Sequence, residues 1–340
     1  MSDSALPSRK QSAPEPRPRR WGRVVGLSLL TLLVLLLLLG YGGAKGWVPE
    51  PVVSAVARVF VGRQADVRPW SADQPANVLI MGLQIGGAST NPLTDSMMVA
   101  SYQPDGNKAV MLSIPRDTWV TIPGHGEGRI NEAFQDGGAQ EAMLTVQQNL
   151  GVPVNYYAIV SYDSLKTVID DVGGITVEVA QTIDDPTFPA PDEIHFDPFH
   201  LEKGTHRLNG YDALRYARTR HADTDFARAQ RQQQVLVALR HELMKPVNWL
   251  KLPVILHDLR STVRTNLPFD QAVTIGLRVL GGGLDNLHRE VLQPSNGAVQ
   301  GFTTAGGAQV LAPNPKVIGQ LVVGLFGPSP SDASWSRSRP

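Results

Sequence analysis

Residues 155–180 read NYYAIVSYDSLKTVIDDVGGITVEVA, and this stretch decides the fold class. Its first part, 155–162, is a short apolar run typical of a strand. Helical spacing follows at 163–174, with Asp163 as the predicted N-cap and two glycines as the stop. Residues 175–180 return to the alternation of a strand. Strand, helix and strand in succession predict a layered α/β domain with a mixed central sheet.

The same alternation continues on both sides of this stretch. Upstream, three apolar runs predict strands at 77–83, 94–102 and 108–115. Helical spacing predicts a helix at 132–151, which begins irregularly and ends at Gly151, and a long helix at 226–244. Beyond Lys251, weaker patterns predict a helix, a strand and a helix near 269–280, 289–293 and 314–326.

The composition excludes several classes of function. The chain has 340 residues, of which 31 are basic and 31 acidic, so no charge bias favours nucleic acid. It contains no cysteine, which excludes disulfides, thiolate zinc sites and a Cys nucleophile. Neither Gly-x-Ser-x-Gly nor His-Glu-x-x-His occurs, so serine-hydrolase and zinc-protease functions lack support. The acidic segment 182–200 contains His195, Asp197 and His200, but their spacing matches no metal motif, and we interpret it as a solvated loop.

The N-terminal region predicts a membrane anchor. Residues 24–41 form an uncharged, leucine-rich run within the ~17–25 residues that a membrane-spanning helix needs. Basic residues dominate the preceding segment, so the positive-inside rule places residues 1–23 in the cytoplasm as a disordered tail. A cleaved signal peptide ending near 42–44 is the alternative, but the apolar run exceeds the usual ~7–15 residues of such peptides. We therefore expect a single-pass anchor and a main domain outside the cytoplasm, where group transfer needs an activated donor instead of ATP.

The rest of the chain divides into three predicted parts. Residues 42–76 are expected to form a stalk or accessory segment, and residues 77–326 the extracytoplasmic domain. A Pro- and Ser-rich flexible tail follows at 327–340.

The densest cationic stretch is RTRHADTDFARAQRQQQ, residues 218–234. Arg228 and Gln232 are four apart on the predicted helix and share a face near its N-terminal end, which itself attracts anions. Arg218 and Arg220 are two apart, so in an extended segment they point the same way. Arginine's planar fork suits phosphate oxygens, so these residues predict an anion site. A solvated cationic surface with acidic neighbours as partners is the alternative.

Two further stretches carry candidate residues. In SIPRDTWVTIPG, residues 113–124, Arg116 and Asp117 follow the end of an apolar strand, where α/β sheets bind ligands; an ordinary turn ion pair is the alternative. In LQIGGASTNPLTDSMM, residues 83–98, Asp95 is the single carboxylate. One aspartate beside phosphates can hold Mg²⁺, and a cap at the start of a strand is the alternative.

Five motifs together resemble one known family. SIPRDT, GRINEAF, YDSLKTVIDDVGGITVEV, HRLNGYDALRYARTRH and DTDFARAQRQQQV are similar, in this order, to the LytR–CpsA–Psr family of bacterial cell-envelope proteins. The resemblance covers residues 77–244, and residues 245–326 resemble the family's ending more weakly. It implies an α/β/α domain held outside the membrane by one N-terminal helix. It also implies a ligase that moves a glycopolymer from a polyprenyl-pyrophosphate carrier onto peptidoglycan, forming a phosphodiester bond.

The resemblance also implies roles for particular residues. The positions that match the family's pyrophosphate-binding residues are Arg116, Arg129, Arg218, Arg220, Arg228 and Gln232. Asp95 matches an aspartate associated with Mg²⁺. Asp225 precedes Phe226 as in the family's DF pair and is expected to orient the arginines or act as a base. The implied catalytic set is Arg116, Arg218, Arg220 and Asp225.

Two positions depart from the family pattern. Gln84 stands where the family usually has a second metal-associated aspartate, and Leu93 stands where it often has an arginine. Gln84 offers a metal an oxygen without a negative charge, so the affinity for Mg²⁺ is expected to fall. These departures keep two alternatives open: a pyrophosphatase that uses water as acceptor, and a non-catalytic polyprenyl-phosphate-binding envelope protein.

Overall fold

The structure is a computed structural model. It describes the chain over residues 75–83, 92–103, 108–190, 194–219, 224–249, 251–268, 271–272, 275–276 and 287–327. The predicted cytoplasmic tail, the anchor at 24–41, nearly all of the stalk, residues 328–340, Gln84 and Arg220 lie outside these ranges. Within the described ranges, none of the helices has the length and apolar character that a membrane span requires.

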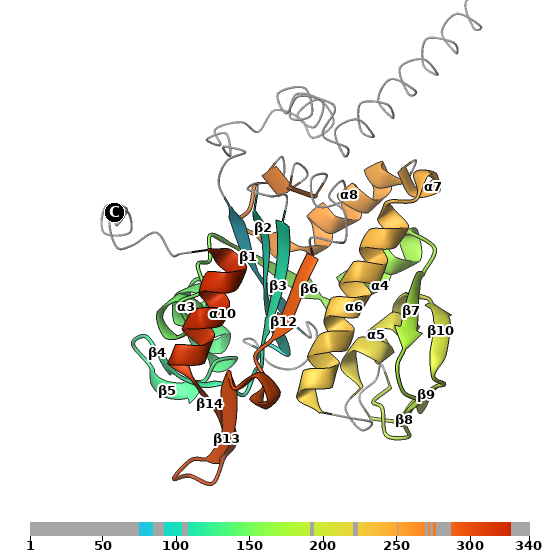
Figure 1. The fold of residues 1–340 in the computed structure, drawn as a ribbon. Coiled ribbons are helices and arrows are strands. Elements are labelled where there is room, and N and C mark those ends of the chain that lie inside the picture. Colours follow the sequence, from blue (N-terminus) through green and yellow to red (C-terminus); the bar gives the residue numbers. More distant parts are fainter. Residues whose placement is uncertain are drawn as a thin grey trace, which may run out of the picture.

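A six-stranded mixed sheet forms the centre of the domain (Figure 1). Its strands, in spatial order, are β11 (Arg264–Thr265), β6 (Tyr156–Ser161), β1 (Ala76–Leu83), β2 (Ser96–Gln103), β3 (Lys108–Ile114) and β12 (Leu287–Val291). The pairs β1–β6 and β3–β12 are parallel, whereas β1–β2, β2–β3 and β11–β6 are antiparallel. Consequently β1, β3, β6 and β12 point in one direction and their carboxyl ends share one edge of the sheet. The predicted mixed sheet is confirmed.

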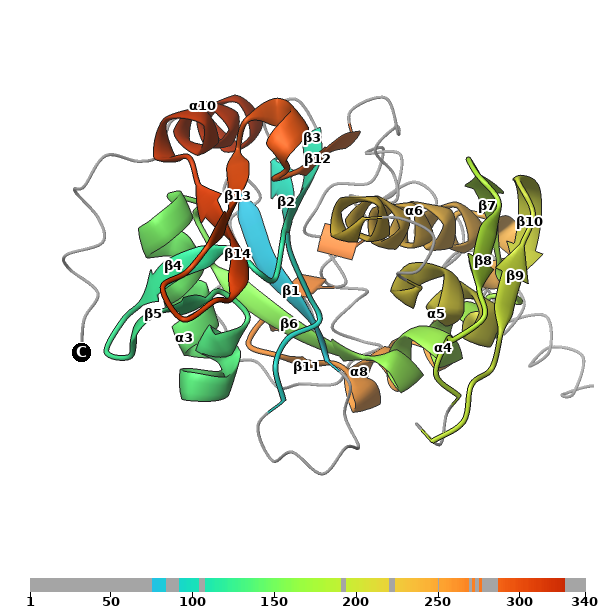
Figure 2. The same cartoon turned by 90° about the horizontal axis from the view of Figure 1, so that it is seen from below.

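Helices cover both faces of this sheet (Figures 1 and 2). One face packs against α3 (Glu132–Leu150) and α10 (Pro315–Phe326). Their apolar side chains join alternate residues of β1, Leu79, Met81 and Leu83, in the first hydrophobic core. On the other side lie α4 (Tyr162–Asp171), α5 (Gly210–Arg218) and α6 (Asp225–Leu243). The three layers are those of an α/β/α domain.

A second hydrophobic core lies on the far side of these helices. It joins α4, α5, α6 and α8 (Leu252–Thr262) to two small sheets, β7–β10 (Ile175–Val179 with Gly204–Leu208) and β8–β9 (Ile183–Asp185 with Phe199–Leu201). The short helix α7 (Pro246–Trp249) connects α6 to α8. The predicted strand at 175–180 therefore exists as β7 but lies outside the central sheet, because its buried face, Ile175, Val177 and Val179, packs on helices.

Two hairpins and a 3₁₀ turn complete the described chain. One hairpin is β4–β5 (Trp119–Ile122 with Gly126–Arg129), and the other is β13–β14 (Val299–Thr303 with Gln309–Pro313). The 3₁₀ turn η2 (Pro294–Asn296) precedes β13. In Figure 1 the β13–β14 hairpin extends beyond the lower end of the central sheet.

Four predictions of local structure need comment. The N-cap of α4 is Ser161, whose hydroxyl accepts the Ser164 amide at 3.1 Å, so the prediction of Asp163 was wrong. We predicted that Arg218 and Arg220 point the same way if their segment is extended. Arg218 is instead the last residue of the helix α5. The irregular start of α3 is confirmed, since Gly138 has φ 70° and leaves helical geometry. The helix predicted near 269–280 lies largely outside the described residues.

Candidate active site

Several candidate side chains meet at the edge where the parallel strands end. Arg116 follows β3 by two residues, and Tyr162 follows β6 directly. Asp95 immediately precedes β2, which runs the opposite way, so its start lies at the same edge. Ligands of open α/β sheets bind beyond the carboxyl ends of the strands, so the topology places these residues where a ligand is expected.

Backbone hydrogen bonds hold the loops that carry these residues. The amide of Asp95 donates to the carbonyl of Gly82 at 3.0 Å. Beyond β3, Thr118 closes a turn by donating from its amide (3.1 Å) and its hydroxyl (2.7 Å) to the carbonyl of Pro115. Asn131 joins the two loops, because its amide donates to the carbonyl of Arg116 and its side chain to that of Thr94. These bonds fix Asp95 and Arg116 relative to each other.

Arg116 lies at the centre of the cluster. Its guanidinium is 3.6 Å from the carboxylate of Asp95, 3.5 Å from that of Asp117 and 3.9 Å from that of Asp225. The Arg129 guanidinium lies 3.4 Å from the other oxygen of Asp117. The Nε atoms of Arg116 and Arg129 have no hydrogen-bond partner within the described part of the chain. Such loose ion pairs are typical of a site whose contacts tighten when a ligand binds.

The first turn of α6 supplies a second cation. Thr224 caps this helix by accepting the amide of Ala227, and Asp225 occupies the first turn. Arg228, one turn on, is buried with 6% exposure, and its guanidinium lies 3.1 Å from Asp225. Asp225 therefore lies between Arg116 and Arg228, two residues more than one hundred positions apart in sequence. The helix N-terminus adds a further positive potential at this point.

Arg218 and Asp95 are connected through Tyr162. The Arg218 guanidinium stacks over the Tyr162 ring at 4.3 Å, and the Tyr162 hydroxyl donates to Asp95 at 2.5 Å. Burial, followed by the negative charge of Asp95 and its hydrogen bond, raises the pKa of Tyr162 well above its ordinary range. Tyr162 thus stays protonated and positions Asp95 throughout the physiological range. We did not predict this residue from the sequence, although its place after a strand that ends at this edge was a usable signal.

Replacing Tyr162 with Phe is expected to reduce the loss of stability at alkaline pH. A tyrosine whose native pKa is raised contributes stability below pH ~10, where the unfolded tyrosine is still protonated, and loses it as the pH rises further. The melting temperature should therefore fall less between pH 9 and 11 in Tyr162→Phe than in the native protein. Tyr156 and Tyr211, whose pKa values are also raised, provide the same background in both proteins. An equal fall in both would contradict the assignment.

The structure describes all of the predicted site residues except Arg220 and Gln84. Gln232 lies one turn beyond Arg228 on α6, and its amide donates to the carbonyl of Ala217 at 3.4 Å. Ion pairs, one hydrogen bond and one cation–π contact connect most of the candidates into a single network. Its members are Arg116, Arg129, Arg218, Arg228, Asp95 and Asp225, together with Asp117 and Tyr162. Arg220 and Gln84 lie outside the described residues.

Of the two candidate metal residues, Asp95 and Gln84, the structure describes only Asp95. The described residues contain no group of three or more His, Cys, Asp or Glu side chains suited to a metal. Asp95 fits Mg²⁺ as a single carboxylate ligand, because this ion keeps several waters and takes its other ligands from substrate phosphates. The chemistry of the donor set therefore fits Mg²⁺ only together with a phosphate-bearing ligand.

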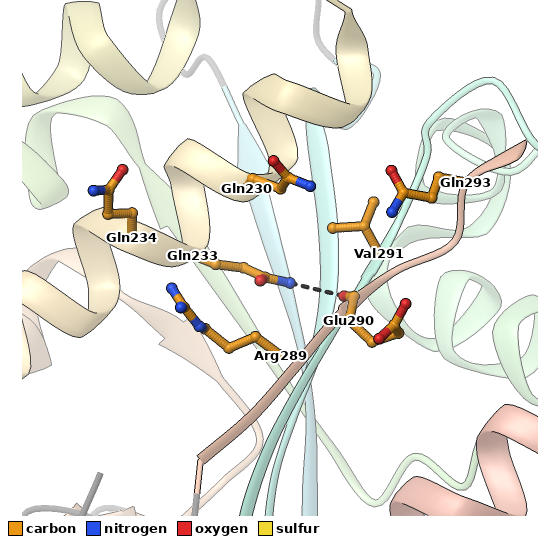
Figure 3. Close-up of a pocket in the computed structure, with 7 residues that line it drawn as sticks. All are labelled: Gln230, Gln233, Gln234, Arg289, Glu290, Val291 and Gln293. Carbon is orange, nitrogen blue, oxygen red and sulfur yellow. Dashed lines mark hydrogen bonds between the residues drawn. The ribbon is translucent and has the colours of Figure 1, made fainter. Parts of the chain in front are cut away.

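A separate cavity of about 380 Å³ lies between α6 and β12 (Figure 3). Its lining is mostly amide side chains, with Gln233 donating to the carbonyl of Glu290 at 2.8 Å. None of the candidate site residues that the structure describes lines it. The cavity is therefore distinct from the arginine network.

Comparisons with known proteins identify the family of the chain. The model of the LytR_cpsA_psr family matches residues 54–312, so the chain belongs to this family. The regulatory protein MsrR of Staphylococcus aureus (strain COL) is 34% identical over 219 residues, which are 62% of this chain and 63% of MsrR. The polyisoprenyl-teichoic acid–peptidoglycan teichoic acid transferase TagV of Bacillus subtilis (strain 168) is 32% identical over 262 residues, 73% of this chain and 65% of TagV. The chain thus spans just under two thirds of the length of these relatives.

Solved structures show the same fold. The crystal structure of B. subtilis TagV superposes with a TM-score of 0.63 at 28% identity, covering 74% of this chain and 96% of that one. TagT bound to LI-WTA superposes with a TM-score of 0.60 at 26% identity, covering 77% of this chain and 93% of that one. The α/β domain with its central six-stranded mixed sheet is therefore shared with members of this family.

Proposed function

We propose that this protein is a phosphotransferase that moves a glycopolymer from a polyprenyl-pyrophosphate carrier to peptidoglycan. The observation that carries the proposal is the arginine network. Arg116, Arg129, Arg218 and Arg228 come from separate segments and converge at one edge of the sheet. Four guanidinium groups beside a helix N-terminus suit a diphosphate. The activity named for TagV, transfer of a polyisoprenyl-linked teichoic acid to peptidoglycan, supports this donor and this acceptor.

The prenyl tail would lie on an apolar face of the sheet beside the network. On β1, residues that alternate with the buried core positions are only half-buried, and they include Val78 and Ile80. Ala100 on β2 is in register with Val78, and the half-buried Ala158 on β6 is in register with Ile80. Val160 on β6, also half-buried, is in register with Gly82. This face is opposite to the one that packs on α3 and α10, so the tail would lie between the sheet and the layer of α4, α5 and α6. The strands β3 and β6 lead from it to the edge that carries Arg116 and Tyr162.

Enlarging Ala158 is expected to impair donors with long tails selectively. In Ala158→Phe the added ring would occupy the half-buried face beside Ile80, its partner on β1. The KM for an undecaprenyl donor should rise about tenfold, the cost of ~1.4 kcal/mol of lost apolar contact, while the KM for a ten-carbon prenyl donor should change less. Ala139→Phe, at a half-buried alanine packed on the first core, is the matched control. Equal effects on both donors would contradict the assignment of this face.

The chemistry rests on positioning and charge. An acceptor hydroxyl attacks the phosphorus that bears the sugar, and the prenyl phosphate leaves with the electron pair of the broken P–O bond. Arg116, Arg218 and Arg228 would stabilise the charge that develops on the diphosphate oxygens. Asp225 lies between two arginines, which supports a role in orienting them or in taking the proton of the attacking hydroxyl.

Magnesium would add a second source of charge neutralisation at Asp95 when bound. Because Gln84 supplies no charge, the native protein should depend only weakly on this ion. In Gln84→Asp we expect transfer to respond to Mg²⁺ at concentrations about tenfold lower than in the native protein. Transfer rates measured over a Mg²⁺ titration check this, and an unchanged midpoint would remove position 84 from the metal site.

We also propose that the domain works outside the cytoplasm, held by the N-terminal anchor. The apolar run at 24–41, the basic residues before it and the membership of a cell-envelope family support this placement.

One assay separates the proposed function from its two alternatives. The full-length chain in detergent is incubated with a lipid-linked glycan and peptidoglycan. Glycan covalently attached to peptidoglycan is the expected product. Release of free phosphorylated glycan alone would identify a pyrophosphatase, and donor binding without turnover would identify a non-catalytic binder.

A further inference from the structure

The two hairpins at the end of the sheet are bonded directly to the arginine site. Thr118 and Leu311 form a parallel bridge, and the amide of Leu311 donates to the carbonyl of Asp117 at 3.0 Å. Arg129 donates from Nη2 to the carbonyl of Gln309 at 3.4 Å. The β13–β14 hairpin is therefore held against the loop that carries Arg116.

Each hairpin contributes one aromatic ring at this junction. Trp119 begins β4 immediately after Thr118, and Phe302 lies on β13. Their ring centroids are 6.5 Å apart with an interplanar angle of 84°. Phe302 is 38% exposed, and neither ring belongs to either hydrophobic core. We call this pair of rings the aromatic platform.

The two hairpins that carry the aromatic platform contain few charged side chains. Residues 299–313 contain no acidic or basic side chain, and residues 119–130 contain only His125, Glu127 and Arg129. Arg129 is engaged by Asp117, and Glu127 accepts the indole N–H of Trp119 at 3.4 Å. The exposed polar side chains near Phe302 are amides and hydroxyls, Gln300, Thr303 and Gln309.

We propose that the aromatic platform binds sugar rings of the acceptor glycan, an inference that rests on the proposed function. The apolar C–H face of a pyranose packs against an aromatic ring, and its hydroxyl and acetamido groups pair with neutral amides and hydroxyls. Hairpins with so few cations do not themselves suit a phosphate-rich polyanion such as a teichoic acid donor. The uncharged glycan backbone of peptidoglycan fits both features.

The position of the platform suits a polymeric acceptor. The β13–β14 hairpin extends beyond the sheet (Figure 1), so a long strand can pass across it without entering the domain. Trp119 is adjacent in sequence to the turn that holds Arg116, and it pairs across the hairpin with Arg129. A sugar ring stacked here would place a neighbouring hydroxyl next to the arginine network.

The test uses full-length Phe302→Ala, with Phe302→Tyr as the conservative variant. The KM for soluble peptidoglycan glycan strands should rise about five- to tenfold in Phe302→Ala and return close to the native value in Phe302→Tyr. The Kd of the same strands, measured by calorimetry without any donor, should rise by the same factor. Leu144→Ala, at an α3 residue that is also 38% exposed, is the matched control and should change neither.

Each other outcome has a definite meaning. A native KM and Kd in Phe302→Ala would overturn the inference while leaving the proposed function in place. A rise in the KM of the lipid-linked donor alone would assign the rings to the donor and overturn the inference. Exposed aromatic residues also occur at membrane interfaces, so a selective loss of binding to anionic vesicles would overturn it as well. If the native chain turns over no lipid pyrophosphate but Phe302→Ala still weakens glycan binding, the proposed function fails and the glycan site stands.

Discussion

Arg116→Ala is expected to lower kcat/KM for transfer by about a thousandfold. Arg116 lies within 4 Å of three carboxylates, those of Asp95, Asp117 and Asp225. Its removal takes away a guanidinium from the diphosphate and leaves those carboxylates to repel the anionic substrate. Losing one well-placed donor for developing charge costs about 10²–10³ in rate, and the added repulsion places the effect at the upper end. Arg116→Lys should recover only part, because a point charge replaces a planar fork.

Arg215 provides the control for this experiment. Its side chain is shielded from solvent to a similar extent as that of Arg116. It also forms ion pairs, with Asp197 at 3.2 Å and with Asp212 at 2.5 Å. However, it lies beside the second hydrophobic core and outside the arginine network. Arg215→Ala should lower the melting temperature and leave kcat/KM of the folded protein within about twofold. If Arg215→Ala reduced kcat/KM as much as Arg116→Ala, the losses would reflect stability instead of the proposed site.

Asp225→Asn should reduce kcat by about a hundredfold or more, and the KM of the donor much less. Asn keeps the shape of the side chain but cannot take a proton and pairs weakly with Arg116 and Arg228. Loss of a positioned general base costs about 10²–10⁴. Steady-state kinetics with the lipid-linked donor check the division between kcat and KM.

Asp212 is the matched control for Asp225. Each is the acidic residue in the first turn of its helix and pairs with the arginine three positions later. Asp212→Asn therefore removes an equivalent helical ion pair without touching the site, and kcat should be unchanged. A fall in donor affinity with native kcat in Asp225→Asn would limit Asp225 to orienting the arginines.

The central strands and long helices were predictable because their patterns are local. The apolar runs that became β1, β3 and β6 lie within single short segments, as does the spacing of α6. The site arginines were identified from motifs, and the parallel-strand rule indicated the edge at which Arg116 lies. The contacts among them depend on the packing of α5 and α6 beside the sheet, which spacing along the chain does not define.

The missed features depend on contacts that the local residue pattern does not reveal. The strands β4 and β5 have only four residues each, and the sequence of β5, GEGR, lacks the apolar alternation that predicts a strand. They pair across the turn between them, and β4 also contacts β14. The role of Tyr162 arises from partners 67 and 56 positions away, Asp95 and Arg218. β7 has the pattern of a sheet strand, but it pairs with β10 and packs on α6 outside the central sheet.

Binding of a short prenyl pyrophosphate tests the central claim most directly. Calorimetry with geranyl pyrophosphate requires no acceptor and no turnover, so it measures only whether the guanidinium groups share one diphosphate. Arg116→Ala, Arg218→Ala and Arg228→Ala should each weaken binding at least tenfold, and Arg215→Ala should bind as the native protein does. Native affinity in all three network variants would contradict the account.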